Sequence, residues 1–101
     1  MTTTTQTKMH AYLTSLGLTD LSLNESLTAI NQRPVFNAAD AAAALVILKN
    51  ALRDCEYSKY SANHGVEHVF RVKGCGTVKI NVHRAYPTMQ APIFVTPFAV
   101  F

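Results

Sequence analysis

The chain has 101 residues, of which 49% are hydrophobic and 15% are charged, and its formal net charge is +3. This length corresponds to one domain with a modest buried core. The hydrophobic content excludes an intrinsically disordered chain, which combines low hydrophobicity with high net charge. No apolar run approaches the roughly 18 residues of a membrane span, and the polar N-terminus lacks a signal peptide's apolar segment. With only two cysteines, a cytoplasmic protein with reduced thiols is expected.

The N-terminal segment 1–7 is polar and rich in threonine, and we expect a disordered tail that precedes a single α+β domain at 8–101. Apolar residues recur at helical spacing over 8–16, which predicts a first short helix. Gly17 follows this segment, and glycine is the residue that most often stops a helix. A second short helix is predicted over 25–31.

The strongest helical pattern covers residues 37–56. Asn37 is a favoured N-cap, and Asp40 stands three residues later, at the position of a capping-box partner. Six of the seven residues from 38 to 44 are alanine, the best helix former. One apolar stripe runs along the segment and consists of Ala41, Leu45, Leu48, Leu52 and Cys55. The pattern predicts one long helix that packs against the rest of the domain.

After this helix the apolar period changes from helical to alternating, which indicates strands. Residues 57–62 are either the end of the helix or a first strand. Strands at 66–73 and 78–83 form a hairpin around a glycine-rich turn. The last strand, 93–101, is interrupted by Pro97. The sequence therefore predicts an α+β fold: two short helices and one long helix, then an antiparallel meander of three to four strands, with the long helix packed on one sheet face.

Two cysteines and two histidines have a spacing that zinc ligands can adopt. The series Cys-x8-His-x3-His-x6-Cys is formed by Cys55, His64, His68 and Cys75. The cysteines are not paired at close spacing, so unrelated thiols and ordinary histidines are the simpler interpretation. Cys75 between two glycines is also a candidate nucleophile, but the sequence carries no catalytic signature. We expect no metal and no cofactor, and a Cys/His metal-binding module is the least favoured function.

The C-terminal half of the chain is basic, because residues 57–101 contain five Lys and Arg side chains and one acid, Glu67. Basic side chains on a β-ribbon can contact nucleic-acid phosphates. The candidates on or beside the polar face of the hairpin 66–84 are Arg71, Lys73, Lys79, His83 and Arg84. A nucleic-acid-binding domain is therefore the alternative function, and a solvated strand face is the structural alternative.

The C-terminal strand supplies the main functional hypothesis. A strand with one wet face alternates polar and apolar residues, and 93–101 does not. We expect an edge strand whose inner face turns Ile93, Val95 and Phe101 toward the long helix; the reverse assignment of the two faces is left open. The outer face then offers a surface to a protein partner or to a second copy of the chain, formed by Phe94, Phe98 and Val100. A strand buried in the core is the alternative.

These features favour a small non-enzymatic binding protein that acts by protein–protein contact. Viral or phage-encoded inhibitors of host enzymes and bacterial accessory subunits have this size and this lack of a catalytic signature, and we expect a function of the inhibitor or accessory-subunit type. A viral origin would place the protein in the host cytoplasm. No membrane partner is expected.

Overall fold

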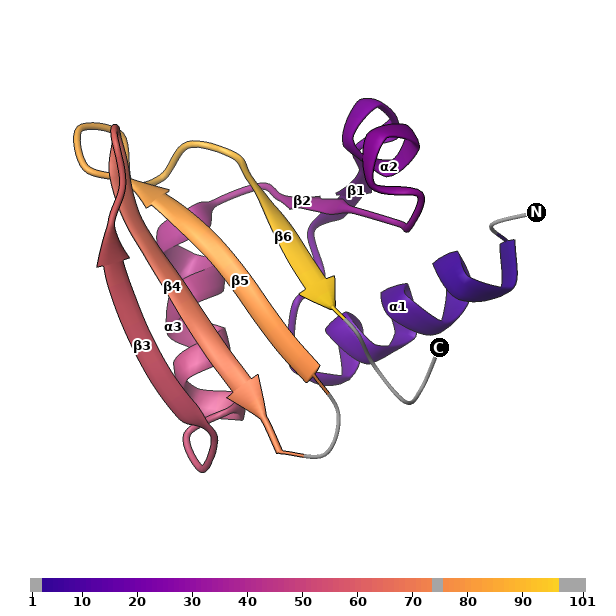
Figure 1. Cartoon of the computed structure of the whole chain (residues 1–101), viewed down its shortest axis with the longest axis horizontal. Helices are drawn as coiled ribbons and strands as arrows, with labels where there is room; N and C mark the ends of the chain where they lie inside the picture. Colours follow the sequence, from indigo (N-terminus) through magenta and orange to yellow (C-terminus); the bar gives the residue numbers. More distant parts are fainter. Residues whose placement is uncertain (1–2, 74–75, 97–101) are drawn as a thin grey trace.

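The computed structural model describes residues 3–73 and 76–96. Over these ranges the chain is an α+β fold of three helices and a six-stranded antiparallel sheet (Figure 1). The helices are α1 (Thr3–Ser15), α2 (Glu25–Asn31) and α3 (Ala41–Ala51). The strands are β1 (Leu21–Leu23), β2 (Phe36–Ala38), β3 (Glu56–Ser61), β4 (Gly65–Val72), β5 (Gly76–His83) and β6 (Ala91–Thr96). No helix in the described ranges has both the length and the apolar character needed to cross a bilayer.

The α+β class and the antiparallel sheet agree with the sequence prediction, but the strand count does not. The predicted meander is present as β3–β4–β5–β6, and residues 57–62, which the sequence left open, belong mainly to β3. Two three-residue strands from the N-terminal half extend the sheet to the order β1-β2-β6-β5-β4-β3. Strand β6 was expected at an edge. It lies inside the sheet instead, because β2 pairs with it through Phe36 and Ile93.

The long helix is shorter than predicted and begins at a different cap. Oδ1 of Asp40 accepts a hydrogen bond from the Ala43 N–H at 3.1 Å, so Asp40 is the N-cap of α3. Asn37, the predicted cap, lies in β2, where its Oδ1 accepts a hydrogen bond from Asn24 at 3.1 Å. Asn37 and Ala38, which local propensity assigns to the start of the helix, are therefore part of the sheet instead. The helix ends at Ala51, and the rest of the predicted segment turns into β3.

Helix α1 begins at Thr3, five residues before the predicted start, so residues 3–7 continue the helix instead of forming the predicted tail. The helix stop agrees with the sequence: Gly17 has a φ of 107°, and the Leu18 N–H bonds to the Leu13 carbonyl at 3.2 Å. Leu18 is 3% exposed and belongs to the core. This turn directs the chain from α1 into β1.

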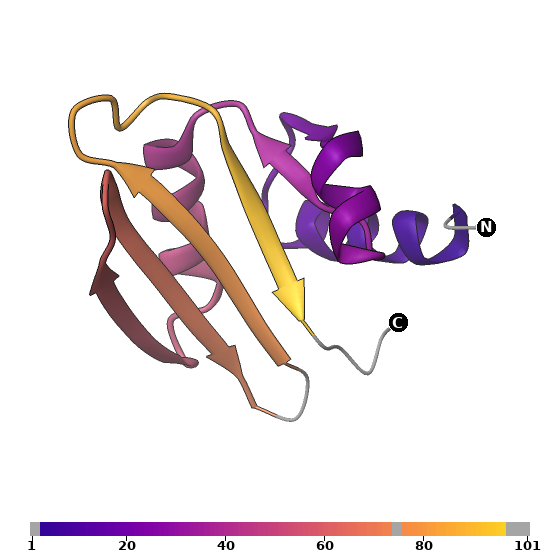
Figure 2. The ribbon, with the colours of Figure 1, turned by 45° about the horizontal axis from the view of Figure 1, so that its top comes forward.

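The core lies between α1, α3 and one face of the sheet. Figure 2 shows α3 behind β4 and β5, while α1 and α2 gather near β1 and β2. The largest fully buried side chains of this core are Met9, Leu13, Leu48, Phe70, Val78, Ile80, Ile93 and Val95. Because side chains alternate along a strand, the sheet has a helix side, which carries the buried strand residues of this core, and an opposite face. Figure 1 looks onto that opposite face over β3, β4 and β5, with α3 behind them. We call it the open face.

Candidate functional site

Four residues form a row across the middle of the open face. Ser58 of β3 is opposite Val69 of β4, Val69 is opposite Lys79 of β5, and Lys79 is opposite Phe94 of β6. The Lys79 ammonium lies 5.8 Å from the centre of the Phe94 ring, and Phe94 is half-buried. A cation held over an aromatic face is attracted by the ring quadrupole. This row therefore combines the aromatic ring of Phe94 and the aliphatic Val69 with the hydroxyl of Ser58 and the ammonium of Lys79. A second aromatic side chain, the exposed Tyr60 of β3, lies on the same face, opposite Glu67.

The charges on the open face balance. Arg71 forms an ion pair with Glu56 on the neighbouring strand, with a distance of 3.2 Å between Nη1 and Oε1. Glu67 lies on the same face as Lys79, one row away. Among the described strand residues, two cations and two carboxylates therefore occupy the face that the sequence predicted to be basic.

The remaining basic candidates lie at opposite ends of the hairpin. Lys73 follows β4 at one end. At the other end, the Arg84 guanidinium donates a hydrogen bond to the Ser61 hydroxyl at 3.0 Å. Nδ1 of His83 accepts hydrogen bonds from the backbone N–H groups of Ala85 and Tyr86, each at 3.1 Å. The structure thus distributes the five predicted phosphate contacts along the hairpin and does not gather them in one patch.

The candidate zinc ligands are also separated. The His64 ring stacks on His83, with 6.0 Å between ring centres, whereas His68 is buried on the helix side of β4. Four residues of extended chain span roughly 13 Å, which is too far for two ligands of one zinc ion. Cys55 lies in the connection from α3 to β3, and Cys75 lies outside the described residues. No three described side chains are arranged to hold a metal.

The C-terminal strand orients its side chains as predicted over the part that the structure describes. Ile93 and Val95 are 0% and 1% exposed and belong to the core, and Phe94 lies on the open face. Phe98, Val100 and Phe101 lie outside the described residues. Phe94 is thus the described member of the predicted partner surface.

Strand β3 brings together two groups that the sequence analysis did not connect. The Tyr57 hydroxyl lies 2.6 Å from Nδ1 of His68, and the two rings stack. Burial lowers the pKa of His68, and the cations of Lys49 and Lys59 lower it further. The sequence shows that Tyr57 and Lys59 are two residues apart and would share one face of a strand. Only the pairing of β3 with β4 shows which side chains they contact.

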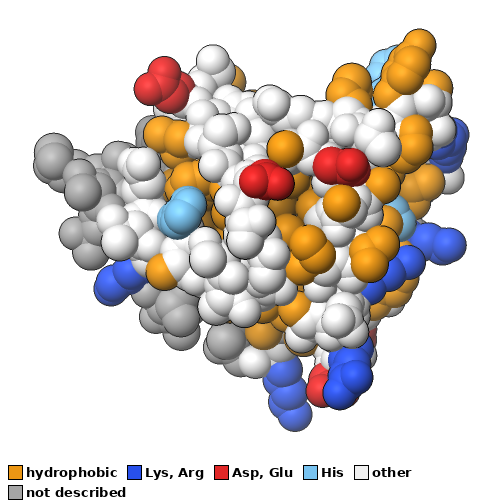
Figure 3. Space-filling model, turned by 180° about the vertical axis from the view of Figure 1, so that it is seen from behind, with side chains coloured by type: hydrophobic (Ala, Val, Ile, Leu, Met, Phe, Trp, Pro, Cys, Tyr) orange, Lys and Arg blue, Asp and Glu red, His pale blue; other side chains and the backbone are white. Residues whose placement is uncertain are grey.

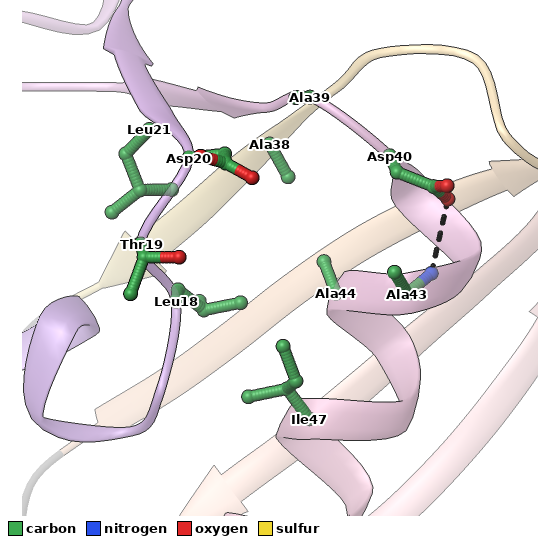
Figure 4. A pocket seen from close by; sticks show the side chains of 10 residues that line it. All are labelled: Leu18, Thr19, Asp20, Leu21, Ala38, Ala39, Asp40, Ala43, Ala44 and Ile47. Atoms are coloured by element: carbon green, nitrogen blue, oxygen red, sulfur yellow. Dashed lines mark hydrogen bonds between the residues drawn. The ribbon is translucent and has the colours of Figure 1, made fainter.

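Two of the hollows between elements are small, whereas the grooves beside β3 are larger and open, with volumes of about 320 and 510 Å³. Figure 4 shows one that lies between α3 and the start of β1, with a volume of about 60 Å³. Its ionisable side chains are Asp20 and Asp40, and Asp40 is already engaged in capping α3. A second hollow of about 80 Å³ lies beside Phe94, between the end of β6 and the Arg33–Val35 segment. Ligand pockets usually measure about 300–1,000 Å³, so neither hollow accommodates a cofactor.

Comparison of the chain with protein-family models, with curated proteins and with solved structures gives no match.

Proposed function

We propose that the protein is a small non-enzymatic binding protein of the cytoplasm, of the inhibitor or accessory-subunit type, which acts by protein–protein contact through the open face around Phe94. One observation carries the proposal. Phe94 is an aromatic side chain in an interior strand, yet it remains partly exposed on a sheet face where no helix of the described residues covers β3, β4 and β5 (Figure 1).

The surroundings of Phe94 suit a protein contact. Aromatic side chains beside small pockets supply much of the binding energy in protein interfaces. The hollow of about 80 Å³ next to Phe94 has room for one small apolar group of a partner. Around it, Lys79 and the Arg71–Glu56 pair leave the face without a strong net charge. A nearly neutral face that carries Phe94 and, at its β3 margin, the exposed Tyr60 loses little solvation when a partner covers it.

Nucleic-acid binding is the second candidate, and the five basic or imidazole side chains along the hairpin favour it. A phosphate-binding surface needs its cations unpaired and close together. Arg71 is paired with Glu56 and Arg84 bonds to Ser61, so the geometry supports this candidate less than a protein contact. The variant Arg71→Ala with Lys73→Ala and Lys79→Ala tests it by fluorescence anisotropy with labelled DNA and RNA at low salt.

We expect the wild-type protein to bind neither nucleic acid under these conditions. Salt-sensitive binding that the triple variant loses would make nucleic-acid recognition the function and remove the protein-contact proposal. The direct test of the protein contact is sedimentation velocity of wild type and Phe94→Asp, followed by recovery of a bound protein with each. Loss of self-association or of partner recovery in a folded Phe94→Asp variant supports the proposal.

A further inference from the structure

Strand β3 is the long free edge of the sheet. It pairs with β4 on one side, and no described strand pairs with its other side. Five of its six residues are exposed. A free edge of this length presents backbone N–H and C=O groups to any extended polypeptide that can pair with them. Strand addition of this kind is a common mode of peptide recognition.

Cationic side chains gather on the helix side of this edge. Lys49 and Arg53 line a groove of about 320 Å³ with Tyr57, and the Lys49 ammonium lies 5.2 Å from the centre of the Tyr57 ring. Lys59 is opposite His68 on the helix side of β3, and Arg84 reaches the end of β3 through its bond to Ser61. Figure 3, seen from the α3 side, shows Lys and Arg side chains toward the right margin, where β3 lies. We call this set the basic edge; it consists of Lys49, Arg53, Lys59 and Arg84.

The acidic side chains nearest this edge do not lie on its helix side; Glu56 belongs to β3 but lies on the open face. Asp40 caps the opposite end of α3, Glu56 pairs with Arg71, and Glu67 lies on the open face. Asp54 lines a different groove, which it shares with Glu56 and Arg71. No member of the basic edge forms an ion pair within the described residues. The lowered pKa of His68, to which Lys49 and Lys59 contribute, is consistent with a positive potential at this edge.

We propose that the basic edge binds an acidic, extended segment of a partner protein, which adds to β3 as a further strand of the sheet. Such a segment pairs its backbone with β3. Because strand side chains alternate, acidic residues at every second position lie on the helix side, facing Lys49, Lys59 and Arg84. The surface is separate from the contact proposed above, since β4 and β5 lie between β3 and the strand of Phe94.

Two other occupants fit this edge less well. A second copy of the chain pairing β3 with β3 brings two sets of the same four cations together, and like charges across an interface oppose association. A nucleic acid offers phosphates to the cations, but its backbone lacks the alternating donors and acceptors that complete a strand ladder. An acidic peptide satisfies both the cations and the unpaired backbone.

The test uses the whole isotope-labelled chain and a synthetic peptide of about eight alternating Glu and Thr residues, a length that matches a strand. We expect the peptide to shift the amide resonances of β3 and to slow their hydrogen exchange. A peptide of the same sequence with every backbone amide methylated keeps the charge but offers no N–H donor to the ladder, and we expect it not to bind.

Charge variants complete the design. Lys59→Glu reverses an exposed charge in β3, and Lys8→Glu makes the same change on the exposed surface of α1. We expect Lys59→Glu to weaken peptide binding at least about tenfold and Lys8→Glu to leave it within about twofold. Phe94→Asp should bind the peptide as wild type does, which separates this site from the open face.

Three results would overturn the proposal. The first is an absence of peptide-induced shifts in β3. The second is equal binding of the methylated peptide, which would show attraction by charge alone. The third is displacement of the peptide by an oligothymidylate of equal charge that binds more tightly, which would assign the basic edge to nucleic acid.

Discussion

The phenol oxygen of Tyr57 lies 2.6 Å from Nδ1 of His68, and the two rings are stacked at 5.9 Å with 12° between their planes. His68 is 7% exposed, and the positive charges of Lys49 and Lys59 disfavour its protonated form. Burial lowers the pKa of His68 below its ordinary value of 6.5, and the two lysines lower it further. The folded protein therefore holds this imidazole in its neutral form at neutral pH.

The lowered pKa of His68 makes folding stability depend on pH. The unfolded chain titrates this group near 6.5, so below that pH the unfolded state binds more protons than the folded state. The stabilisation is fully present above pH 6.5 and is lost as the pH falls toward the pKa of the folded state. We expect the urea midpoint of the wild type to decrease as the pH falls over this interval. In His68→Phe, the urea midpoint should depend less steeply on pH.

The control for this prediction is His10→Gln, which removes an exposed imidazole from α1 and should keep the wild-type slope. The pH dependence of the urea midpoint is compared, and not its absolute value, because His68→Phe also changes packing in the core. A slope in His68→Phe equal to that of the wild type would show that His68 is not the titrating group.

Leu48 tests the predicted importance of α3 for the core. It is 0% exposed and belongs to the main core cluster. Leu48→Ala should lower the free energy of unfolding by about 2–5 kcal/mol, because it removes buried methyl groups and leaves a cavity. Val46 on the same helix is 67% exposed, and Val46→Ala should change stability by less than about 0.5 kcal/mol. Equal denaturant midpoints for the two variants would contradict this assignment of the core.

Asp40 tests the observed start of α3. Replacing an N-cap aspartate by alanine costs about 1 kcal/mol, since the Ala43 N–H loses its partner. The matched control is Asp20→Ala, which removes the same charge from an exposed side chain at the same hollow. We expect chemical denaturation to show a loss for Asp40→Ala only. Equal losses would mean that the removed charge, and not the cap, determines the effect.

The sequence predicted the elements that have a strong local pattern. Alternation over β4 and β5, the glycine stop after α1 and the inward orientation of Ile93 and Val95 all agree with the structure. The strands β1 and β2 were missed, because three residues are too few to establish an alternating period. Asn37 was assigned to a helix cap because local preference for a cap is strong, whereas its role in β2 depends on β6, far away in the sequence.

The sequence predicted less about the candidate surfaces, because these depend on which side chains become neighbours in the folded chain. A count of charges found the basic half of the chain, but not the pairing of Arg71 with Glu56. The basic edge combines Lys49 of α3, Lys59 of β3 and Arg84 beyond β5, and its members become neighbours only when the sheet and helix are packed. Phe94 was predicted to lie on the outer face because successive side chains of a strand point to opposite faces, and it stands between Ile93 and Val95.

The separation of the Cys/His residues leads to a prediction about metal. His64 lies beside His83 while His68 bonds to Tyr57, so these two imidazoles do not converge. We expect purified protein to contain well under one equivalent of zinc by elemental analysis, and a chelator to leave the unfolding midpoint unchanged. A stoichiometric metal ion, together with a loss of stability when a chelator is added, would contradict this prediction and favour a Cys/His metal-binding module.

The most direct measurement of the proposed contact compares tagged wild type, Phe94→Asp and Val46→Asp in affinity purification from cells in which the protein occurs naturally. Both variants replace an apolar side chain by aspartate, one on the open face and one on the exposed side of α3, where Val46 is 67% exposed. Circular dichroism first establishes that both are folded. Quantitative mass spectrometry should then recover one protein, either a partner or the untagged chain itself, with wild type and Val46→Asp, and about tenfold less of it with Phe94→Asp. Equal recovery with Phe94→Asp, or recovery of nucleic acid in place of a protein, would contradict a protein contact through the open face.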